Sequence, residues 1–446
     1  MEHDYITLPK PHDTHAMSGS ELFEYFVKNP TAVNTYLTEV SQRQYLYWDK
    51  AQYRQPIDGL SAADSFRLAK NMRRVSARPL PVRAVDGTYF SWMRQDKIDR
   101  LLRKIDMYAG GQLLTDSSLF SGQSGKQQYI TRGIIEEAIA SSQLEGADTS
   151  RRYAKKMIAE NIKPRNSSDW MILNNHALLN KIESDYKSQP LSLPLLLELH
   201  ADLTRNTLKD GDVGRLRNDA DNIVVLYKER IAHTPPNEAF LHRELEALIH
   251  YVNDDNEDNF VHPVIKAIIL HFWIGYLHPF VDGNGRIART LFYWYMLRHD
   301  YWAFTYLPIS AAIKRAPRQY AYAYIYSEQD DYDFTYFLDY HLSKIIDAID
   351  DFIHFLDRTK RENSEVCKKL LTTCNLNDRQ RQIVLYLLSD VAHYTSVTSH
   401  QTLSGVARPT ASRDIKQLHE AGLLVARRKG NTIQYFASDT LRQLSM

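Results

Sequence analysis

The sequence contains little cysteine, little net charge and no long apolar run. Its two cysteines, Cys367 and Cys374, are too few for a disulfide framework, and no Cys/His cluster has zinc-site spacing. A net charge of +1 in 446 residues gives no general reason to expect binding to nucleic acid or membrane. No apolar run reaches transmembrane length, and the opening residues lack a signal-peptide core. These absences predict a cytoplasmic protein with no membrane partner.

The densest group of chemically active side chains lies in residues 278–289, which read HPFVDGNGRIAR. The apolar run before it predicts a buried helix over residues 263–277, with a proline in its first turn. This helix should end at His278, because the following Pro279 disfavours helical backbone there. The imidazole of His278 is therefore expected at the mouth of a loop.

The second half of this segment has the features of a phosphate site. Gly283 and Gly285 allow consecutive backbone N–H groups to converge on an anion. Apolar residues return at helical spacing from Arg286, so the loop leads into a helix N-terminus, which attracts phosphate. Arg286 and Arg289 lie three residues apart, on one face of that helix. Asp282 is suited to hold Mg²⁺ together with substrate phosphate oxygens.

The segment resembles the motif of the Fic family, HPFx[D/E]GNGRxxR, at every specified position. This resemblance implies an all-helical core that transfers AMP from ATP, the substrate, to a protein hydroxyl. It implies that His278 is the general base, Asp282 the Mg²⁺ ligand and Phe280 a buried anchor. The nucleotide-binding residues that it implies are Gly283, Asn284, Gly285, Arg286 and Arg289. His271, seven residues before His278, is interpreted as a core histidine.

A second motif lies at the end of a predicted helix over about residues 128–146. Residues 141–146 read SSQLEG and resemble the family's inhibitory motif, [S/T]xxxE[G/N]. The resemblance implies that Glu145 pairs with Arg289 and blocks productive binding of the γ-phosphate. One guanidinium cannot hold a carboxylate and a phosphate in the same bidentate geometry. The same glutamate could instead position water for removing AMP, and the sequence leaves both directions open.

Two further pieces match the family. Short β-like runs at residues 223–225 and 231–236 predict a hairpin that resembles the family's flap, which aligns a target segment as an added strand. An ordinary surface hairpin is the alternative. His233 in the hairpin and Tyr320 beyond the motif are assigned to nucleotide binding.

The C-terminal stretch resembles a winged helix-turn-helix. A helix is predicted over residues 376–388, with Asn377 as a possible N-cap, and a helix–glycine turn–helix over residues 402–418. Two strands around residues 429–431 follow. Residues placed toward DNA are Arg408, Thr410, Ser412 and Arg413 in the recognition helix and Arg427, Arg428 and Lys429 in the wing. Protein docking is an equal alternative.

The sequence thus predicts a mainly α fold: an all-helical core with a small hairpin flap, and a C-terminal winged helix-turn-helix. Three parts are expected: a mostly helical region over 1–110 with a docking or scaffold role, a catalytic domain over 111–365, and the C-terminal module over 366–446. Helical patterns near 18–29 and 62–75 precede a hairpin over 81–90.

Two functions compete. The first is an autoinhibited protein adenylyltransferase, and the second is a DNA-binding regulator whose Fic core senses nucleotide. The expected partners are a target protein with an acceptor Tyr, Thr or Ser hydroxyl, which includes the chain itself, and DNA through the C-terminal module. A homodimer is an open alternative.

Overall fold

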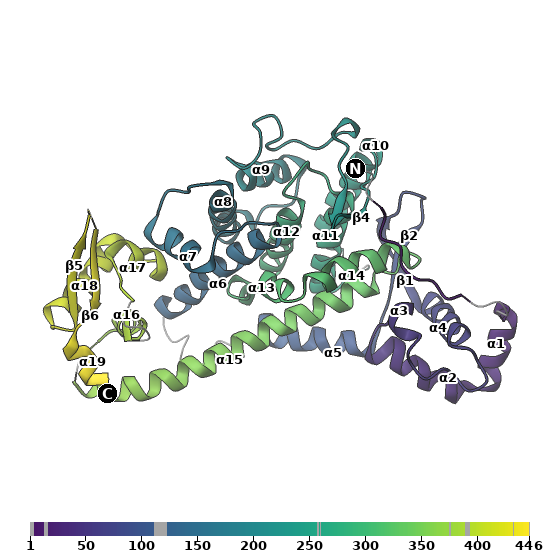
Figure 1. Cartoon of the computed structure of the whole chain (residues 1–446), viewed down its shortest axis with the longest axis horizontal. Coiled ribbons are helices and arrows are strands. Elements are labelled where there is room, and N and C mark those ends of the chain that lie inside the picture. Colours follow the sequence, from purple (N-terminus) through teal and green to yellow (C-terminus); the bar gives the residue numbers. More distant parts are fainter. Residues whose placement is uncertain are drawn as a thin grey trace.

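The computed structural model describes residues 4–12, 17–110, 123–256, 258, 260–373, 376–388, 393–430 and 432–445. The molecule is elongated, with the N-terminal region at one end, the C-terminal module at the other and a helical body between them (Figure 1). Residue 111, where the predicted catalytic domain begins, and Cys374 lie outside the described residues. Within the described ranges, none of the helices combines the length and apolar character needed to cross a bilayer.

The N-terminal elements are α1 Gly19–Lys28, α2 Pro30–Leu37, the π-helical turn Thr38–Arg43, α3 Trp48–Ala51, α4 Ala62–Ser76, β1 Ala77–Arg83, β2 Tyr89–Met93, α5 Asp96–Ile105 and the π-helical turn Asp106–Gly110. The body continues with α6 Gln123–Leu144, α7 Arg151–Glu160, α8 Ser167–Lys181, the π-helical turn Ile182–Tyr186, α9 Leu193–Thr204, the 3₁₀ turn Asp219–Asp221, β3 Val225–Tyr227, β4 Arg230–His233, α10 Glu238–Asn253, α11 Pro263–Leu277, α12 Asn284–Arg298, the 3₁₀ turn Trp302–Thr305, α13 Ile309–Lys314, α14 Pro317–Gln329 and α15 Thr335–Thr373. The C-terminal elements are α16 Asp378–Leu388, α17 Val397–Ser404, α18 Arg408–Glu420, β5 Leu424–Lys429, β6 Thr432–Ala437 and α19 Asp439–Ser445.

Helices dominate this order, which confirms the predicted mainly α class. In the described residues the strands form three separate antiparallel pairs, β1–β2, β3–β4 and β5–β6, and no larger sheet. The pairs correspond to the three hairpins expected from the sequence, although β1 begins four residues before the predicted run. Helices α1 and α4 lie where the periodicity predicted them, and Ser18 caps α1 in a reciprocal box with Glu21.

The largest hydrophobic cluster surrounds α11, whose side chains are almost all buried. Helix α12 packs along it, and α15 crosses beneath both (Figure 1). Leu80, Phe90 and Ile98, from β1, β2 and α5, belong to the same cluster. The packing therefore runs across residue 110, and the domain boundary proposed there stays a prediction.

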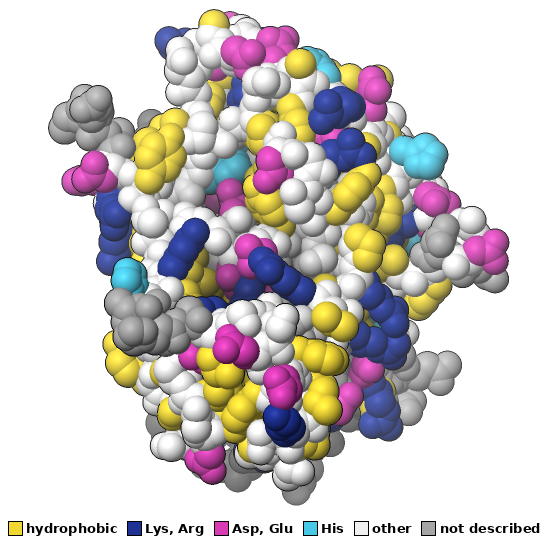
Figure 2. All heavy atoms as spheres, turned by 90° about the vertical axis from the view of Figure 1, so that its right-hand side faces the viewer, with side chains coloured by type: hydrophobic (Ala, Val, Ile, Leu, Met, Phe, Trp, Pro, Cys, Tyr) yellow, Lys and Arg dark blue, Asp and Glu magenta, His cyan; other side chains and the backbone are white. Residues whose placement is uncertain are grey.

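A second cluster, formed by α1–α4 with parts of α14 and α15, fixes the N-terminal region to the body. The guanidinium of Arg73 lies at its centre and is 2% exposed. It donates to Ser41 Oγ at 2.9 Å, to Val40 O at 2.7 Å and to Tyr336 Oη at 3.0 Å. Because Tyr336 belongs to α15, this buried cation links the two regions. Figure 2 shows this end of the molecule, where apolar and charged side chains are interspersed.

The C-terminal module has its own small core and packs against α6 and α7. Asn377 caps α16 as predicted, since its Oδ1 accepts the N–H of Gln380 at 3.0 Å. Tyr394 donates to Glu160 of α7 at 2.5 Å, which joins the module to the body. The helix–turn–helix–hairpin order agrees with the sequence prediction, but Asn431 in the predicted wing turn lies outside the described residues.

Helix α6 lies very close to the body at Gly133. A Cβ atom at this position would lie 2.1 Å from the Cα of Tyr306 and 2.6 Å from the carbonyl oxygen of Thr305. Both are backbone atoms of the segment that follows α12, so they cannot move aside as a side chain does. The absence of a side chain at Gly133 therefore sets the distance between α6 and the body.

We expect Gly133→Ala to destabilise the protein by roughly 1–3 kcal/mol, the usual cost of overpacking a core. Urea unfolding followed by circular dichroism measures this change. Gly19→Ala in α1 is the control, because a Cβ there meets nothing within 4 Å. Equal unfolding midpoints for the Gly133→Ala variant and the unmodified protein would contradict the close approach.

Candidate active site

Helix α11 ends at His278, as the sequence predicted. His278 adopts the left-handed conformation, with φ 48° and ψ 59°, and its N–H donates to the carbonyl oxygen of Ile274 at 2.9 Å. A left-handed residue is a common way to end a helix, but it is costly for a residue other than glycine. The chain then turns through residues 279–283 and enters α12. The turn places His278 on one side of the loop and the start of α12 on the other.

The hydrogen bonding of His278 defines its tautomer. Nδ1 lies 3.3 Å from the carbonyl oxygen of Gly275, which can only accept, so Nδ1 carries the proton. Nε2 is left with a lone pair, and the described residues offer it no hydrogen bond. Burial, with a contribution from the nearby His233, lowers the pKa of His278 to about 3. The imidazole is therefore neutral at pH 7 and able to accept a proton.

The loop between α11 and α12 is tied together by Asn284. Its Oδ1 accepts the N–H of Phe280 at 2.9 Å, and its Nδ2 donates to the carbonyl oxygen of Phe280 at 2.8 Å. Gly283 has φ 86°, and its N–H donates to Asp282 Oδ1 at 2.6 Å. The side chain of Asn284 thus closes the loop. The backbone N–H of Asn284 belongs to the first turn of α12, where N–H groups lack intrahelical acceptors. Phe280 is fully buried, in agreement with its predicted role as an anchor.

His200 of α9 supports the loop from below and was not singled out in the sequence. Its ring stacks on Phe280 with 3.7 Å between centroids and an interplanar angle of 2°. Nε2 donates to the carbonyl oxygen of Asp282 at 2.9 Å, while Nδ1 accepts the N–H of Gly214 at 3.0 Å. Burial lowers the pKa of His200 to about 4, which keeps the ring neutral. A lone histidine in the apolar sequence of α9 carries no signal of this role.

The two motif arginines are both buried. Arg286 is fully buried, and its nearest acceptors are the carbonyl oxygen of Leu203 at 3.4 Å and Asp282 Oδ2 at 3.8 Å. Nε and Nη2 of Arg286 have no hydrogen-bond partner within the described part of the chain. Burial lowers the pKa of Arg286. A buried guanidinium with unfilled donors is a favourable site for an anion such as phosphate.

Arg289 is held by the end of α6. Its Nε donates to Ser141 Oγ at 2.9 Å, and its Nη2 donates to the carbonyl oxygen of Ser141 at 3.0 Å and to Glu145 Oε1 at 2.8 Å. Burial opposes the charge on Arg289, but Glu145, Tyr320 and Glu137 together raise its pKa. The carboxylate of Glu145 also covers the start of α12, because a Cβ at Gly285 would lie 2.2 Å from Oε1. Glu145 therefore occupies a position where an anion would meet both Arg289 and the helix N-terminus.

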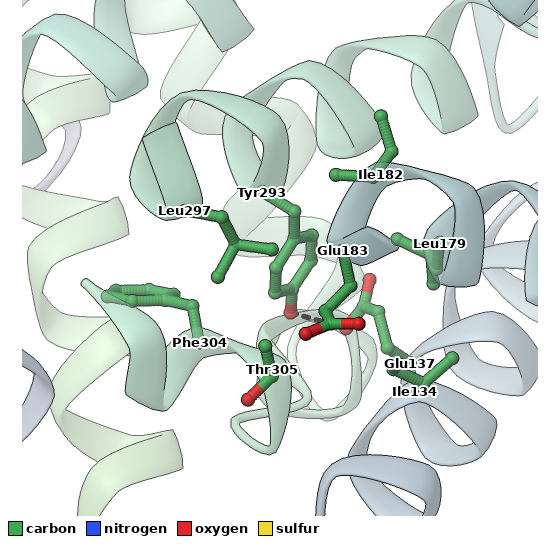
Figure 3. A pocket seen from close by; sticks show the side chains of 9 residues that line it. All are labelled: Ile134, Glu137, Leu179, Ile182, Glu183, Tyr293, Leu297, Phe304 and Thr305. Carbon is green, nitrogen blue, oxygen red and sulfur yellow. Dashed lines mark hydrogen bonds between the residues drawn. The ribbon is translucent and has the colours of Figure 1, made fainter. Parts of the chain in front are cut away.

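Helix α6 is anchored by a second, fully buried carboxylate, Glu137. It accepts hydrogen bonds from Tyr293 Oη of α12 at 2.8 Å and from the N–H of Ser310 of α13 at 2.9 Å. Figure 3 shows Glu137 and Tyr293 pointing toward each other beside a small pocket lined mainly by apolar side chains. Burial raises the pKa of Glu137 despite these donors. Because Glu137, Ser141 and Glu145 are spaced by four residues, one face of α6 contacts the body along two turns.

Strands β3 and β4 form the predicted hairpin, which we call the flap hairpin. The chain's own N-terminal segment lies beside β4 and pairs with it in parallel, a feature the sequence did not indicate. The N–H of Ile6 donates to the carbonyl oxygen of Ile231 at 2.9 Å. The N–H of Ile231 donates to the carbonyl oxygen of Asp4 at 2.9 Å. The outer edge of β4 is thus occupied by residues 4–6.

The remaining predicted nucleotide contacts lie near the site but have other partners. His233 of β4 faces two acceptors, Glu328 Oε2 at 2.7 Å and the carbonyl oxygen of Tyr276 at 2.8 Å. Burial opposes protonation of His233, but Glu328 raises its pKa. Tyr320 of α14 is half-buried, and its hydroxyl bonds to His271 Nε2 at 2.9 Å. Contact of His233 and Tyr320 with a nucleotide stays a prediction, whereas His271 is a buried core histidine as interpreted.

A divalent cation would meet Asp282 at the mouth of the loop. Its side chain is 56% exposed, and one carboxylate oxygen is not used by the Gly283 N–H. No group of three or more His, Cys, Asp or Glu side chains suited to a metal occurs in the described ranges. One carboxylate combined with substrate phosphates and water is an arrangement suited to Mg²⁺. Asp282 thus fits a cation that arrives with a nucleotide.

The C-terminal residues assigned to DNA lie on the surface, apart from the half-buried Thr410. The exposed residues on α18 are Arg408, Ser412 and Arg413. The exposed residues on β5 are Arg427, Arg428 and Lys429. Arg379, also basic, is instead bound to the buried Asp414 at 2.6 Å, and His400 contacts the same carboxylate at 3.1 Å.

Residues 190–296 match the Fic/DOC family. The match includes α9, the flap hairpin, α11 and most of α12, and so contains His200, His278 and both motif arginines. The chain therefore contains a Fic domain, as the motif led us to expect.

Relatives with this domain are similar over part of their length. Protein adenylyltransferase Fic of Drosophila grimshawi is 35% identical over 69 residues, 16% of this chain and 14% of that protein. Protein adenylyltransferase fic-1 of Caenorhabditis elegans is 26% identical over 212 residues, 45% of this chain and 37% of that protein. The matches thus span well under half of these relatives.

A solved structure supports the fold of the body. A Fic-1 fragment from C. elegans superposes with a TM-score of 0.50 at 16% identity, covering 76% of this chain and 86% of that chain. A Fic family protein from Desulfovibrio desulfuricans G20 gives a TM-score of 0.49 at 19% identity, with 78% of this chain and 97% of that chain covered. Together with the family match, the superposition on the Fic-1 fragment from C. elegans indicates an all-helical Fic fold.

The burial of His200 leads to a pH-dependent contribution to stability. An unfolded histidine has a pKa near ~6.5, whereas the folded His200 has a pKa of about 4. Below pH ~6.5 the unfolded state takes up a proton that the folded state does not, so the contribution of His200 is lost as the pH falls toward 4. The free energy of unfolding of the unmodified protein exceeds that of His200→Gln by an amount that includes this contribution. This difference should shrink by up to about 1.4 kcal/mol for each unit by which the pH falls below ~6.5.

Urea unfolding of both proteins at pH 7.5 and 5.5 measures this difference. His354→Gln, at an exposed position of α15, is the control. A constant difference for His200→Gln would contradict a neutral, buried His200.

Proposed function

We propose that this protein transfers AMP from ATP to the hydroxyl of a Tyr, Thr or Ser side chain of a protein, itself included, and that Glu145 restrains the reaction. The observation that carries the proposal is the neutral His278 imidazole, with a free Nε2, on the loop that leads to the anion-binding start of α12. The adenylyltransferase names of the relatives support the same reaction class.

In the proposed reaction, Nε2 of His278 takes the proton of the acceptor hydroxyl as its oxygen attacks the α-phosphorus of ATP. The new bond joins this oxygen to phosphorus, the bond between the α-phosphorus and its bridging oxygen breaks, and pyrophosphate leaves. Because His278 is neutral, its Nε2 lone pair is available, and a positioned general base contributes about 10²–10⁴-fold in rate.

Three features of this chain are suited to the polyphosphate. The backbone N–H groups at the start of α12, around Gly283–Gly285, attract negative charge through the helix dipole. The unfilled Nη2 donor of Arg286 lies beneath the same turn, 3.6 Å from a Cβ placed at Gly283. Asp282 would hold Mg²⁺, which when bound offsets the negative charge of the phosphates.

The contact between Glu145 and Arg289 supports autoinhibition. The carboxylate and a phosphate would compete for the same guanidinium and for the space above Gly285. With Glu145 in place, ATP could enter but its terminal phosphate would lack Arg289. The same glutamate could orient a water molecule for removal of AMP from a modified protein, and this reverse reaction is an alternative direction for the same site.

We expect Glu145→Gly to raise auto-AMPylation about 10–100-fold, the factor that corresponds to losing a charged hydrogen bond of about 1.5–3 kcal/mol. Purified protein is incubated with ATP labelled at the α-phosphate, and incorporation into protein is followed over time. Gln143→Gly is the matched control, because it loosens the same last turn of α6 without releasing Arg289. A Glu145→Gly rate equal to that of the unmodified protein would rule out restraint by Glu145.

Adding His278→Ala to Glu145→Gly should remove nearly all incorporation, by about 10²–10⁴-fold. If the double variant retains full activity, His278 is not the base.

To test the reverse direction, AMP-modified protein is incubated with the unmodified enzyme and with Glu145→Gly. If the unmodified enzyme releases AMP and Glu145→Gly does not, the result would favour removal of AMP as the reaction that Glu145 supports.

The C-terminal module gives a second candidate function, binding to DNA. The supporting observation is that cationic side chains are exposed on both α18 and β5, the helix and hairpin that a winged helix presents to the duplex. Arg379 is not part of this surface, because Asp414 holds it inside the module.

A mobility-shift assay with duplex DNA across a salt series tests this function. The affinity should fall steeply as salt rises, and Arg408→Gln/Arg413→Gln should lower the slope of log K against log salt by about 0.9 for each lost phosphate contact. Arg205→Gln/Arg243→Gln, two exposed arginines of the body, is the control. Absence of binding at low salt would favour a protein-docking role.

A further inference from the structure

Arg217 lies in the segment between α9 and the flap hairpin and is only 4% exposed. Its Nε donates to the carbonyl oxygen of His278 at 2.7 Å, and its Nη2 donates to the carbonyl oxygen of Leu277 at 3.1 Å and to that of Pro236 at 2.5 Å. Its own N–H donates to the carbonyl oxygen of Pro279 at 2.9 Å. One residue thus contacts three consecutive carbonyl groups around the candidate base.

These carbonyl groups need partners because they lie at the end of a helix. The last four carbonyl oxygens of an α-helix lack intrahelical donors, and at the end of α11 the left-handed His278 turns the chain away from regular pairing. Arg217 satisfies the carbonyls of Leu277 and His278, and His233 satisfies that of Tyr276. Cationic groups are favourable here, because the helix dipole is negative at this end.

The burial of Arg217 is unusual because no carboxylate forms an ion pair with it in the described residues. Asp219 and Asp221 are close enough to favour its charged form, but burial still lowers its pKa. The neighbouring Arg215 differs, since it forms ion pairs with Asp212 and Asp221 and is more exposed. A buried guanidinium without a carboxylate is costly to the fold, so contact with backbone carbonyls is its structural role.

We propose that Arg217 is the positioning residue of His278: its planar fork fixes the carbonyl groups of residues 277 and 278 and so aims the imidazole at the substrate. A lysine cannot reproduce this, because a single ammonium has no rigid fork to span several carbonyls. Arg217 touches neither substrate nor the reacting atoms in this role. The inference rests on the proposed AMP transfer, in which His278 accepts the proton.

The kinetic test uses the Glu145→Gly background, with Arg217→Met and Arg217→Lys compared with Arg215→Met. Arg217→Met should lower kcat about 100-fold, the loss typical of a displaced catalytic group, and leave KM for ATP within about threefold. Arg217→Lys should recover only part of kcat, and Arg215→Met should match the background. Circular dichroism verifies that each variant is folded. An unchanged kcat, or an equal loss in Arg215→Met, would overturn the proposal.

A second measurement does not depend on activity. In ¹⁵N-histidine spectra, with His278 assigned from His278→Ala, the unmodified ring should stay neutral with its proton on Nδ1 between pH 5 and 8. In Arg217→Met the ring loses a cationic neighbour and its fixed backbone, so its pKa should rise and both tautomers should appear. The charged groups beside His278 are Arg217 and His233, and His233 is unchanged in this variant.

The kinetic and spectroscopic measurements distinguish a failure of the proposed AMP transfer from a failure of the proposed role of Arg217. If Glu145→Gly incorporates no AMP, the proposed function fails, and the His278 spectra alone decide whether Arg217 positions the ring. If AMP is incorporated but kcat is unchanged in Arg217→Met, the function stands and the role of Arg217 is refuted.

Discussion

The structure depends on how α11 ends. His278 must leave the helix in a left-handed conformation, and the chain must reverse within five residues to begin α12. This geometry is unfavourable for a histidine by itself, so other groups have to maintain it. Asn284 closes the loop from within, His200 supports it from below, and Arg217 holds the carbonyl groups on either side of His278. The candidate base and the N-terminus of α12 are thereby brought to the same loop.

The same loop contains the point of proposed regulation. Arg289 lies on the first turns of α12 and is contacted by the end of α6, from which Ser141 and Glu145 both bind its guanidinium. Glu137 anchors α6 to α12 and α13 two turns earlier, and Gly133 allows the helix to lie against the backbone of the body. The position of Glu145 is therefore set by the packing of the whole helix.

Both ends of the chain return to the body in ways that bear on this site. Residues 4–6 pair with the outer edge of β4, so a protein segment adding to that edge would have to displace them. The C-terminal module packs against α6 and α7 and is joined to α7 through Tyr394 and Glu160. Helix α6 thus contacts the Fic domain on one side and the C-terminal module on another.

The sequence by itself determined the local features: the end of α11 before Pro279, the glycine turn, the flap hairpin and the helices of the C-terminal module. Each follows from short-range effects, namely proline sterics, glycine conformations and apolar periodicity. The pairing of Glu145 with Arg289 was accessible only through a family motif. The tertiary structure alone decided the support of the loop by His200 and Arg217, the anchoring by Glu137 and the pairing of residues 4–6 with β4. These contacts join residues tens to hundreds of positions apart, and no local pattern records which distant carbonyl group a buried side chain will meet.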